Sequence, residues 1–165
     1  MDTEKIGVVV NDLSLSQLNY YLIDNTNRHI AGPGKMLNVI AFYENCCLPC
    51  IPLNFASMPV SELYGYDGTL VTTNLTTTMR ALNSFGPSSI FFYLWDLEWI
   101  RYQQKRWADF AQIYRNPKIK LLCRSEEHKR VVEGCWNVSV EGVCNDWDYQ
   151  SLLNVVLRRN TIGVA

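Results

Sequence analysis

Short apolar runs rich in β-branched and aromatic residues recur along this chain, and segments with helical periodicity lie between them. Residues 6–10 are apolar on both faces, a pattern that is typical of a buried parallel strand. Ser14 and Gln17 then have the spacing of a capping box, and leucines follow at helical intervals until the pattern fades at residues 24–27. A strand that leads at once into an amphipathic helix indicates a β–α unit.

The same alternation continues to the end of the sequence. Further strands are predicted at residues 39–43, 51–55, 69–73, 89–95, 119–123 and 138–140. Helices are predicted after Asn74, over residues 98–114, from Ser125 to Gly134 and after Asp148, and a loop is predicted at residues 29–35. Because strands and helices alternate, we predict an α/β fold: a Rossmann-like three-layer domain with a mostly parallel sheet and helices on both faces. The length of 165 residues fits a single domain over residues 1–165.

The charge pattern argues against a nucleic-acid partner. The net charge is −1 and the basic residues are scattered, whereas a nucleic-acid surface needs them concentrated. The densest basic stretch, residues 101–106, is interpreted as the solvent-facing side of a helix. No run approaches the roughly 18 apolar residues of a membrane span, and the start of the chain lacks the features of a signal peptide. We therefore expect no membrane association and a cytoplasmic location.

The cysteines and glycines argue against a bound metal or a common cofactor. Cys47 and Cys50 form one Cys-x-x-Cys pair, but a structural zinc site needs a matching second pair and none exists. Cys123, Cys135 and Cys144 lie in or beside apolar segments and are expected to be buried free thiols. The turn after the first strand lacks the glycines of a dinucleotide site, and the chain has no Walker lysine. We expect no metal and no cofactor.

Polar residues follow the predicted strands, at the positions where parallel sheets bind ligands. Because the carboxyl ends of parallel strands share one edge of the sheet, we expect these side chains to gather along a single rim. The ligand-binding candidates are Asp12, Asn74, Glu98, Arg124, Ser125, Glu126 and His128, and the candidate catalytic residue is Asp96. For Asn74 and Ser125 the alternative is a helix cap, and for His128 and its charged neighbours it is simple solvation.

Asp96 and Glu98 are the carboxylates whose surroundings best fit a functional role. They follow the most apolar predicted strand and lie between Trp95 and Trp99. Aromatic rings beside acidic groups suit the faces and hydroxyls of sugars, and an aspartate at a strand end can accept a proton from a hydroxyl. The alternative is that both tryptophans belong to the core and that the acids cap the next helix.

From about Ser89 onward, the order of elements resembles the amino-terminal domain of GT-B glycosyltransferases, especially the retaining ones. In that family a strand ends in His-Asp, a long amphipathic helix follows, and a second strand runs into a helix headed by serine. The matching places here are residues 93–96, 98–114 and 121–132. A turn similar to Asn-Gly-Val-Asp then leads to the family's second domain, and residues 138–146 match its place.

This sequence departs from the family pattern at positions that matter for catalysis and donor binding. Trp95 stands where the family has histidine, and Cys144 stands where the turn has aspartate. The sequence also carries none of the donor domain that holds the nucleotide-sugar. The resemblance therefore implies a non-catalytic or degenerate glycosyltransferase-like module, whose strand carboxyl ends bind a partner protein, a second copy, a sugar or a nucleotide-sugar. A compact domain of this kind would suit a virus or a mobile element.

The alternative is a component of an active enzyme. The chain would then be the acceptor-binding half of a glycosyltransferase, completed by a second chain or copy that binds the nucleotide-sugar. Asp96 would be the base or would orient the acceptor, with Glu98 and residues 124–128 supporting it. The module interpretation instead predicts an exposed apolar patch where the second domain would dock.

Overall fold

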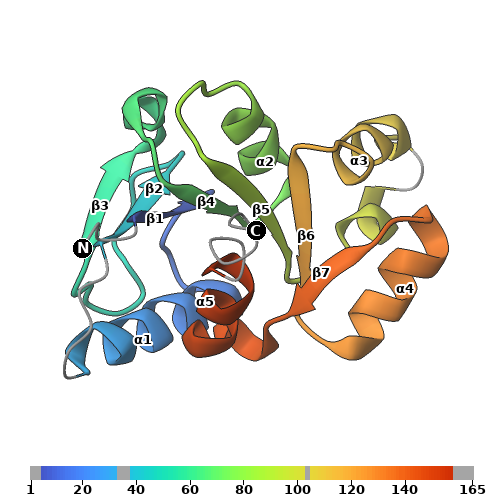
Figure 1. Cartoon of the computed structure of the whole chain (residues 1–165). Coiled ribbons are helices and arrows are strands. Elements are labelled where there is room, and N and C mark those ends of the chain that lie inside the picture. The colour runs from blue at the N-terminus through green and yellow to red at the C-terminus, as the bar shows by residue number, and fades with distance from the viewer. Residues whose placement is uncertain (1–4, 33–37, 103–104, 158–165) are drawn as a thin grey trace, which may run out of the picture.

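Seven strands form one sheet in which every neighbouring pair runs parallel (Figure 1). The computed structural model describes residues 5–32, 38–102 and 105–157. Its strands are β1 (Lys5–Val10), β2 (Asn38–Tyr43), β3 (Ala56–Pro59), β4 (Thr69–Thr72), β5 (Ser89–Leu94), β6 (Ile119–Cys123) and β7 (Val140–Val143). Their order is β3-β2-β1-β4-β5-β6-β7, so the chain passes back across β1 before it enters β4.

The helices of the described residues cover both faces of the sheet. The α-helices are α1 (Gln17–Ala31), α2 (Leu75–Leu82), α3 (Trp107–Tyr114), α4 (Glu126–Trp136) and α5 (Tyr149–Leu157). Three short 3-10 helices are η1 (Val60–Gly65), η2 (Glu98–Tyr102) and η3 (Asn145–Trp147). Helices α1 and α5 pack against one face, and α2, α3 and α4 pack against the other (Figure 1). The predicted α/β, Rossmann-like three-layer fold is therefore confirmed.

The sheet is buried on both faces, which explains the unbroken apolar runs. In β5, Phe91 and Tyr93 face the layer of α1 and α5, whereas Phe92 and Leu94 face the layer of α2, α3 and α4. None of the four is more than 1% exposed. Tyr93 also holds the turn after β7, because its hydroxyl donates to the carbonyl of Cys144 at 2.7 Å. A strand with partners on both faces needs apolar side chains at every position.

Helix α1 continues to Ala31, beyond residues 24–27 where the apolar pattern fades. Two polar residues of this stretch bond to distant loops. Asn25 Nδ2 donates to the carbonyl of Asp146 at 2.9 Å, and Asn27 Nδ2 donates to a carbonyl of the loop after β2 at 2.8 Å. The predicted end of the helix was wrong because these contacts replace apolar packing with long-range hydrogen bonds.

Other predicted boundaries were also wrong. The loop predicted at residues 29–35 is helical as far as residue 31, and residues 33–35 lie outside the described part of the chain. The strand predicted at residues 51–55 is a loop whose apolar side chains pack against the α1–α5 layer, and β3 follows it. The helix predicted over residues 98–114 is divided into η2 and α3, with residues 103–104 not described.

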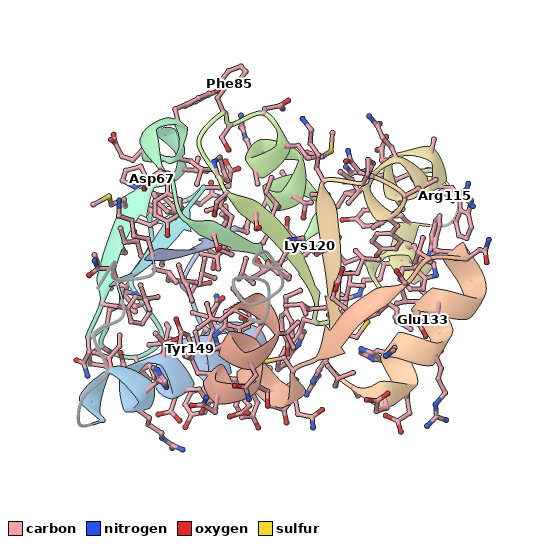
Figure 2. The ribbon with its side chains drawn as sticks, in the orientation of Figure 1. Asp67, Phe85, Arg115, Lys120, Glu133 and Tyr149 are labelled. Carbon is pink, nitrogen blue, oxygen red and sulfur yellow. The ribbon has the colours of Figure 1, made fainter. Side chains whose placement is uncertain are left out.

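Helix α4 and strand β7 also differ from the prediction. The helix does not stop at Gly134 but continues to Trp136, and its C-cap, Asn137, takes the left-handed conformation with a φ of 52°. The last strand begins at Val140 instead of covering residues 138–140. Glu133 ties the two elements together, since its Oε1 accepts a hydrogen bond from the N–H of Val140 at 3.0 Å (Figure 2).

The cysteines are partly as predicted. Cys123 and Cys144 are buried, but Cys135 is exposed because it lies on the solvent side of α4, between the buried Val132 and Trp136. The described residues contain no group of three or more histidine, cysteine, aspartate or glutamate side chains that could hold a metal ion. Within the same residues, no helix is both long and apolar enough to cross a membrane.

Candidate functional site

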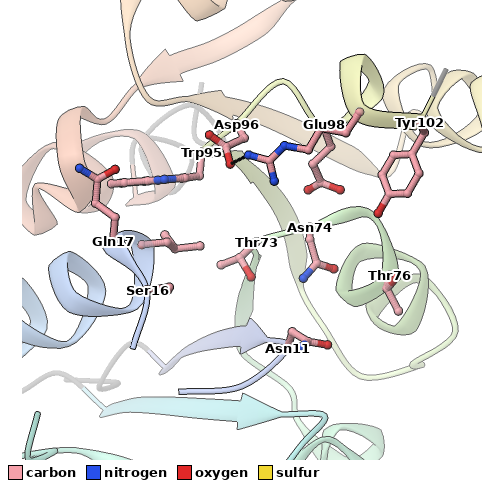
Figure 3. Close-up of a pocket in the computed structure, with 12 residues that line it drawn as sticks. Asn11, Ser16, Gln17, Thr73, Asn74, Thr76, Trp95, Asp96, Glu98 and Tyr102 are labelled. Atoms are coloured by element: carbon pink, nitrogen blue, oxygen red, sulfur yellow. Dashed lines mark hydrogen bonds and ion pairs between the residues drawn. The ribbon is translucent and has the colours of Figure 1, made fainter. Parts of the chain in front are cut away.

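The carboxyl ends of β1, β4 and β5 surround a hollow of about 640 Å³, which we call the switch-point crevice (Figure 3). The strand order reverses between β1 and β4, so α1 and α2 start on opposite faces and leave space between them. The described lining residues are Asn11, Ser16, Gln17, Leu18, Thr73, Asn74, Thr76, Trp95, Asp96, Glu98, Arg101 and Tyr102. Open parallel sheets bind ligands at this position.

The end of β4 is fixed by side-chain hydrogen bonds. Thr73 Oγ1 donates to the carbonyl of Val9 at 3.0 Å, which joins the end of β4 to β1. Asn74 Oδ1 accepts the N–H of Thr77 at 2.9 Å, and Thr77 Oγ1 accepts the N–H of Asn74 at 3.1 Å. This reciprocal pair is a capping box at the start of α2. Asn74 is therefore a helix cap, and it also lines the crevice.

Asp96 lies in the wall of the crevice, directly after β5. Its Oδ2 forms an ion pair with Nη2 of Arg101 in η2 at 2.7 Å. The two side chains are 42% and 69% exposed, so water screens much of their attraction. The negative charge of Asp96 is nevertheless matched by a neighbour.

Glu98 lies deeper in the same crevice. Its Oε2 accepts a hydrogen bond from the N–H of Leu75, the first residue of α2, at 3.3 Å. Burial raises the pKa of Glu98 from 4.5 to about 7, and the nearby charge of Asp96 acts in the same direction. The hydrogen bond from Leu75 opposes this rise because it favours the charged form. Near neutral pH the crevice therefore contains a carboxyl group that exists in both protonation states.

The two tryptophans that flank these acids have different roles. Trp99 belongs to the core, where it packs edge-to-face against Tyr114 and Trp136. Trp95 is also buried, but it lines one side of the crevice and carries the guanidinium of Arg124 over its ring, 3.8 Å from the centroid. The core alternative is therefore right for Trp99 and only partly right for Trp95.

Arg124 and its neighbours form a separate, smaller hollow at the ends of β6 and β7. Arg124 Nη2 pairs with Oδ1 of Asp146 at 2.8 Å, and the ring of Trp95 separates this pair from the crevice. Ser125 is the N-cap of α4, since its Oγ accepts the N–H of His128 at 3.2 Å. The predicted single rim is thus divided into two hollows.

The exposed Glu126 lies in the first turn of α4, where a carboxylate favours the helix dipole. It lines neither hollow in the described structure. Asp12 is also absent from the described lining, because it holds the turn between β1 and α1. Its Oδ1 accepts hydrogen bonds from the N–H of Ser14 at 2.9 Å and from its hydroxyl at 2.6 Å. These bonds, led by the one from the hydroxyl, lower the pKa of Asp12.

Several crevice residues were missed by the sequence analysis. Arg101 and Tyr102 were assigned to the solvent side of a long helix, but η2 turns them toward the end of β5. Ser16 and Gln17 line the crevice from the start of α1. The predicted capping box of Ser14 and Gln17 was misplaced, because Ser16 is the N-cap of α1 and its Oγ accepts the N–H of Asn19 at 3.0 Å. The spacing gave no sign of which hollow the helix start would face.

Comparisons with protein-family models, with curated proteins and with solved structures each found no match. The resemblance to GT-B glycosyltransferases therefore stays a prediction. The crevice is interpreted below from its own geometry and charges.

Proposed function

We propose that this chain is a glycosyltransferase-like binding module, without catalytic activity of its own, that holds a small hydroxyl-rich molecule such as a sugar. The switch-point crevice is the proposed binding site, and the chemistry of its lining supports the proposal most. Half of the described lining residues carry amide or aliphatic hydroxyl side chains, namely Asn11, Ser16, Gln17, Thr73, Asn74 and Thr76. Amides and hydroxyls both donate and accept hydrogen bonds, as sugar hydroxyls do.

Aromatic rings add surface for the apolar face of a sugar. Tyr102 is 40% exposed and lies on the side of the crevice opposite Trp95 (Figure 3). Binding sites for small molecules combine such aromatic surface with a few polar groups that fix orientation. The crevice has both within one hollow.

The charges of the lining argue against a phosphate-bearing ligand. Among the described lining residues Arg101 is the sole cation, and it is paired with Asp96. The turn between β1 and α1, residues 11–16, has no glycine that would let its backbone approach a pyrophosphate. We therefore favour a sugar over a nucleotide-sugar as the ligand.

Two exposed leucines support a protein contact at the same edge of the sheet. Leu15, in the loop after β1, is 85% exposed, and Leu48, in the loop after β2, is 89% exposed. The loops are joined, because the N–H of Cys50 donates to the carbonyl of Leu13 at 2.9 Å. Together they offer apolar surface beside the crevice for a partner protein or a second copy.

The alternative proposal is the acceptor-binding half of a glycosyltransferase that needs a second chain or copy. It is supported by the two carboxyl groups, of Asp96 and Glu98, that line one crevice. Asp96→Asn separates the two proposals. The substitution should abolish sugar transfer by a completed enzyme, but it should change binding of a sugar by the module only slightly.

The binding proposal is tested by thermal unfolding of the full chain with a panel of monosaccharides and nucleotide-sugars. A monosaccharide should raise the melting temperature, and Tyr102→Ala should remove this effect. Tyr64→Ala is the matched control, because Tyr64 is 65% exposed and lies outside the crevice lining. No stabilisation by any sugar, or an equal loss in both variants, would refute the proposal.

A further inference from the structure

We infer that the switch-point crevice selects a hydroxyl-rich ligand that also carries a protonated amine, and that Glu98 binds this amine. The inference rests on the proposed function and specifies the ligand class for the same crevice. The basis for this ligand class is the carboxylate of Glu98, whose negative charge is not paired with any positively charged side chain of the described lining.

The charged side chains of the described lining are Asp96, Glu98 and Arg101. Arg101 is committed to Asp96, with 2.7 Å between Nη2 and Oδ2. No ion pair within 4.0 Å involves Glu98 among the residues that the structure describes. When Glu98 is ionised, the described lining therefore carries one net negative charge.

Glu98 is placed to meet a ligand. One carboxyl oxygen, Oε2, is held by the N–H of Leu75 at 3.3 Å. The other oxygen, Oε1, has no hydrogen-bond partner among the described residues. Figure 3 shows the carboxyl group turned into the crevice on the side of Asn74. A ligand group can therefore reach Oε1 without displacing an existing bond.

The charged and titratable groups around Glu98 do not neutralise its carboxylate. Asp96 acts against the ionised carboxyl, while Arg101 and Arg106 favour it from beyond ion-pair distance. Arg106 has its own partner in Asp109, at 3.1 Å. Tyr114 approaches from α3, where burial keeps its hydroxyl neutral by raising its pKa. Neither arginine is free to neutralise Glu98.

A protonated ligand amine would form an ion pair with Glu98, as Arg101 does with Asp96. A neutral sugar leaves the charge of Glu98 unmatched, and a phosphate or carboxylate adds a second negative charge nearby. The hydroxyls of the ligand would bond to the amide and hydroxyl side chains of the lining. A bound ammonium favours the ionised carboxylate, so binding lowers the pKa of Glu98 and releases a proton.

The amide of Leu75 provides a direct test, because its N–H is bonded to the carboxyl group of Glu98. The 15N-labelled full chain is titrated at pH 7 with D-glucosamine, N-acetyl-D-glucosamine and D-glucose. D-glucosamine should bind about tenfold more tightly than either neutral sugar, as expected for a hydrogen bond between charged groups. In a pH titration, the chemical shift of the Leu75 amide reports the ionisation of Glu98. Bound D-glucosamine should move the midpoint of this titration to lower pH.

Variants separate this inference from the proposed function. Glu98→Gln should remove the tenfold advantage of D-glucosamine over D-glucose, and the control Glu62→Gln, at an exposed position in η1, should keep it. Equal affinity for all three sugars would overturn the inference and leave the proposed function intact. A preference for D-glucosamine that survives in Glu98→Gln would overturn the role of Glu98. If none of the sugars shifts a crevice amide, both proposals fail.

Discussion

Replacement of Glu98 by glutamine should change how the stability of the protein depends on pH. Burial raises the pKa of Glu98 in the folded chain to about 7, whereas its ordinary value is 4.5. Between these pH values the folded state holds a proton that the unfolded state has released. The free energy of unfolding therefore falls as the pH rises from about 4.5 to about 7. Glutamine cannot ionise, so the variant should lack this part of the fall.

The size of the effect follows from the two pKa values. Their separation corresponds to about 3 kcal/mol, because one pKa unit is worth about 1.36 kcal/mol. The crevice is open to water, which weakens the effect, so we expect about 2 kcal/mol. Glutamine keeps an oxygen that can accept the N–H of Leu75, which preserves the start of α2. At pH 8 the variant should be more stable than the parent chain by this amount, and at pH 5 the difference should be only about a quarter as large.

The assay is urea unfolding, followed by tryptophan fluorescence, at one-unit steps from pH 5 to pH 8. The quantity of interest is the difference in unfolding free energy between Glu98→Gln and the parent chain. Glu62→Gln is the matched control, and its difference from the parent should not vary with pH. If the Glu98 variant and the parent lose stability in parallel across the whole range, the burial argument for Glu98 is refuted.

Core packing yields further predictions for the same unfolding assay at a single pH. Trp136→Ala removes a fully buried ring stacked on Trp107 at 4.1 Å, and it should lower the free energy of unfolding by about 3–5 kcal/mol. A loss below about 1 kcal/mol would contradict this packing. Gly134→Ala should raise the free energy by about 0.5–1 kcal/mol, because an added Cβ in α4 meets no atom within 4 Å. Gly68→Ala should instead destabilise, since its Cβ would overlap the carbonyl oxygen of Lys5. A variant as stable as the parent chain would contradict this close approach.

The fold could be predicted from the sequence wherever buried positions produce a local pattern of apolar residues. Strand β5 is apolar at consecutive positions because Phe91 and Phe92 face opposite layers of the core. Strand β3 was misplaced because all four of its residues are exposed, so it carries no apolar pattern. The second half of α1 was missed because Asn25 and Asn27 bond to loops far away in the sequence. Long-range contacts of this kind leave no local signal.

The candidate site was predictable in part for the same reason. Parallel strands bring their carboxyl ends to one edge, and Asn74, Asp96 and Glu98 do line one crevice. Arg124 lies at the same edge but beyond the ring of Trp95, which depends on how that ring packs. Arg101 reaches the crevice through η2, and periodicity alone had indicated a longer helix there. The parallel arrangement of the strands could be predicted from the sequence, but side-chain packing at the rim could not.

The central claim is that the switch-point crevice is where this chain binds its ligand. The most direct measurement is a map of 1H–15N shift changes over the whole labelled chain during titration with D-glucosamine. The account predicts the largest changes at Asn11, Thr73, Asn74 and Leu75, at the carboxyl ends of β1 and β4. Changes confined to the hollow at the opposite edge of the sheet, around Asn38 and Asp67, would contradict it.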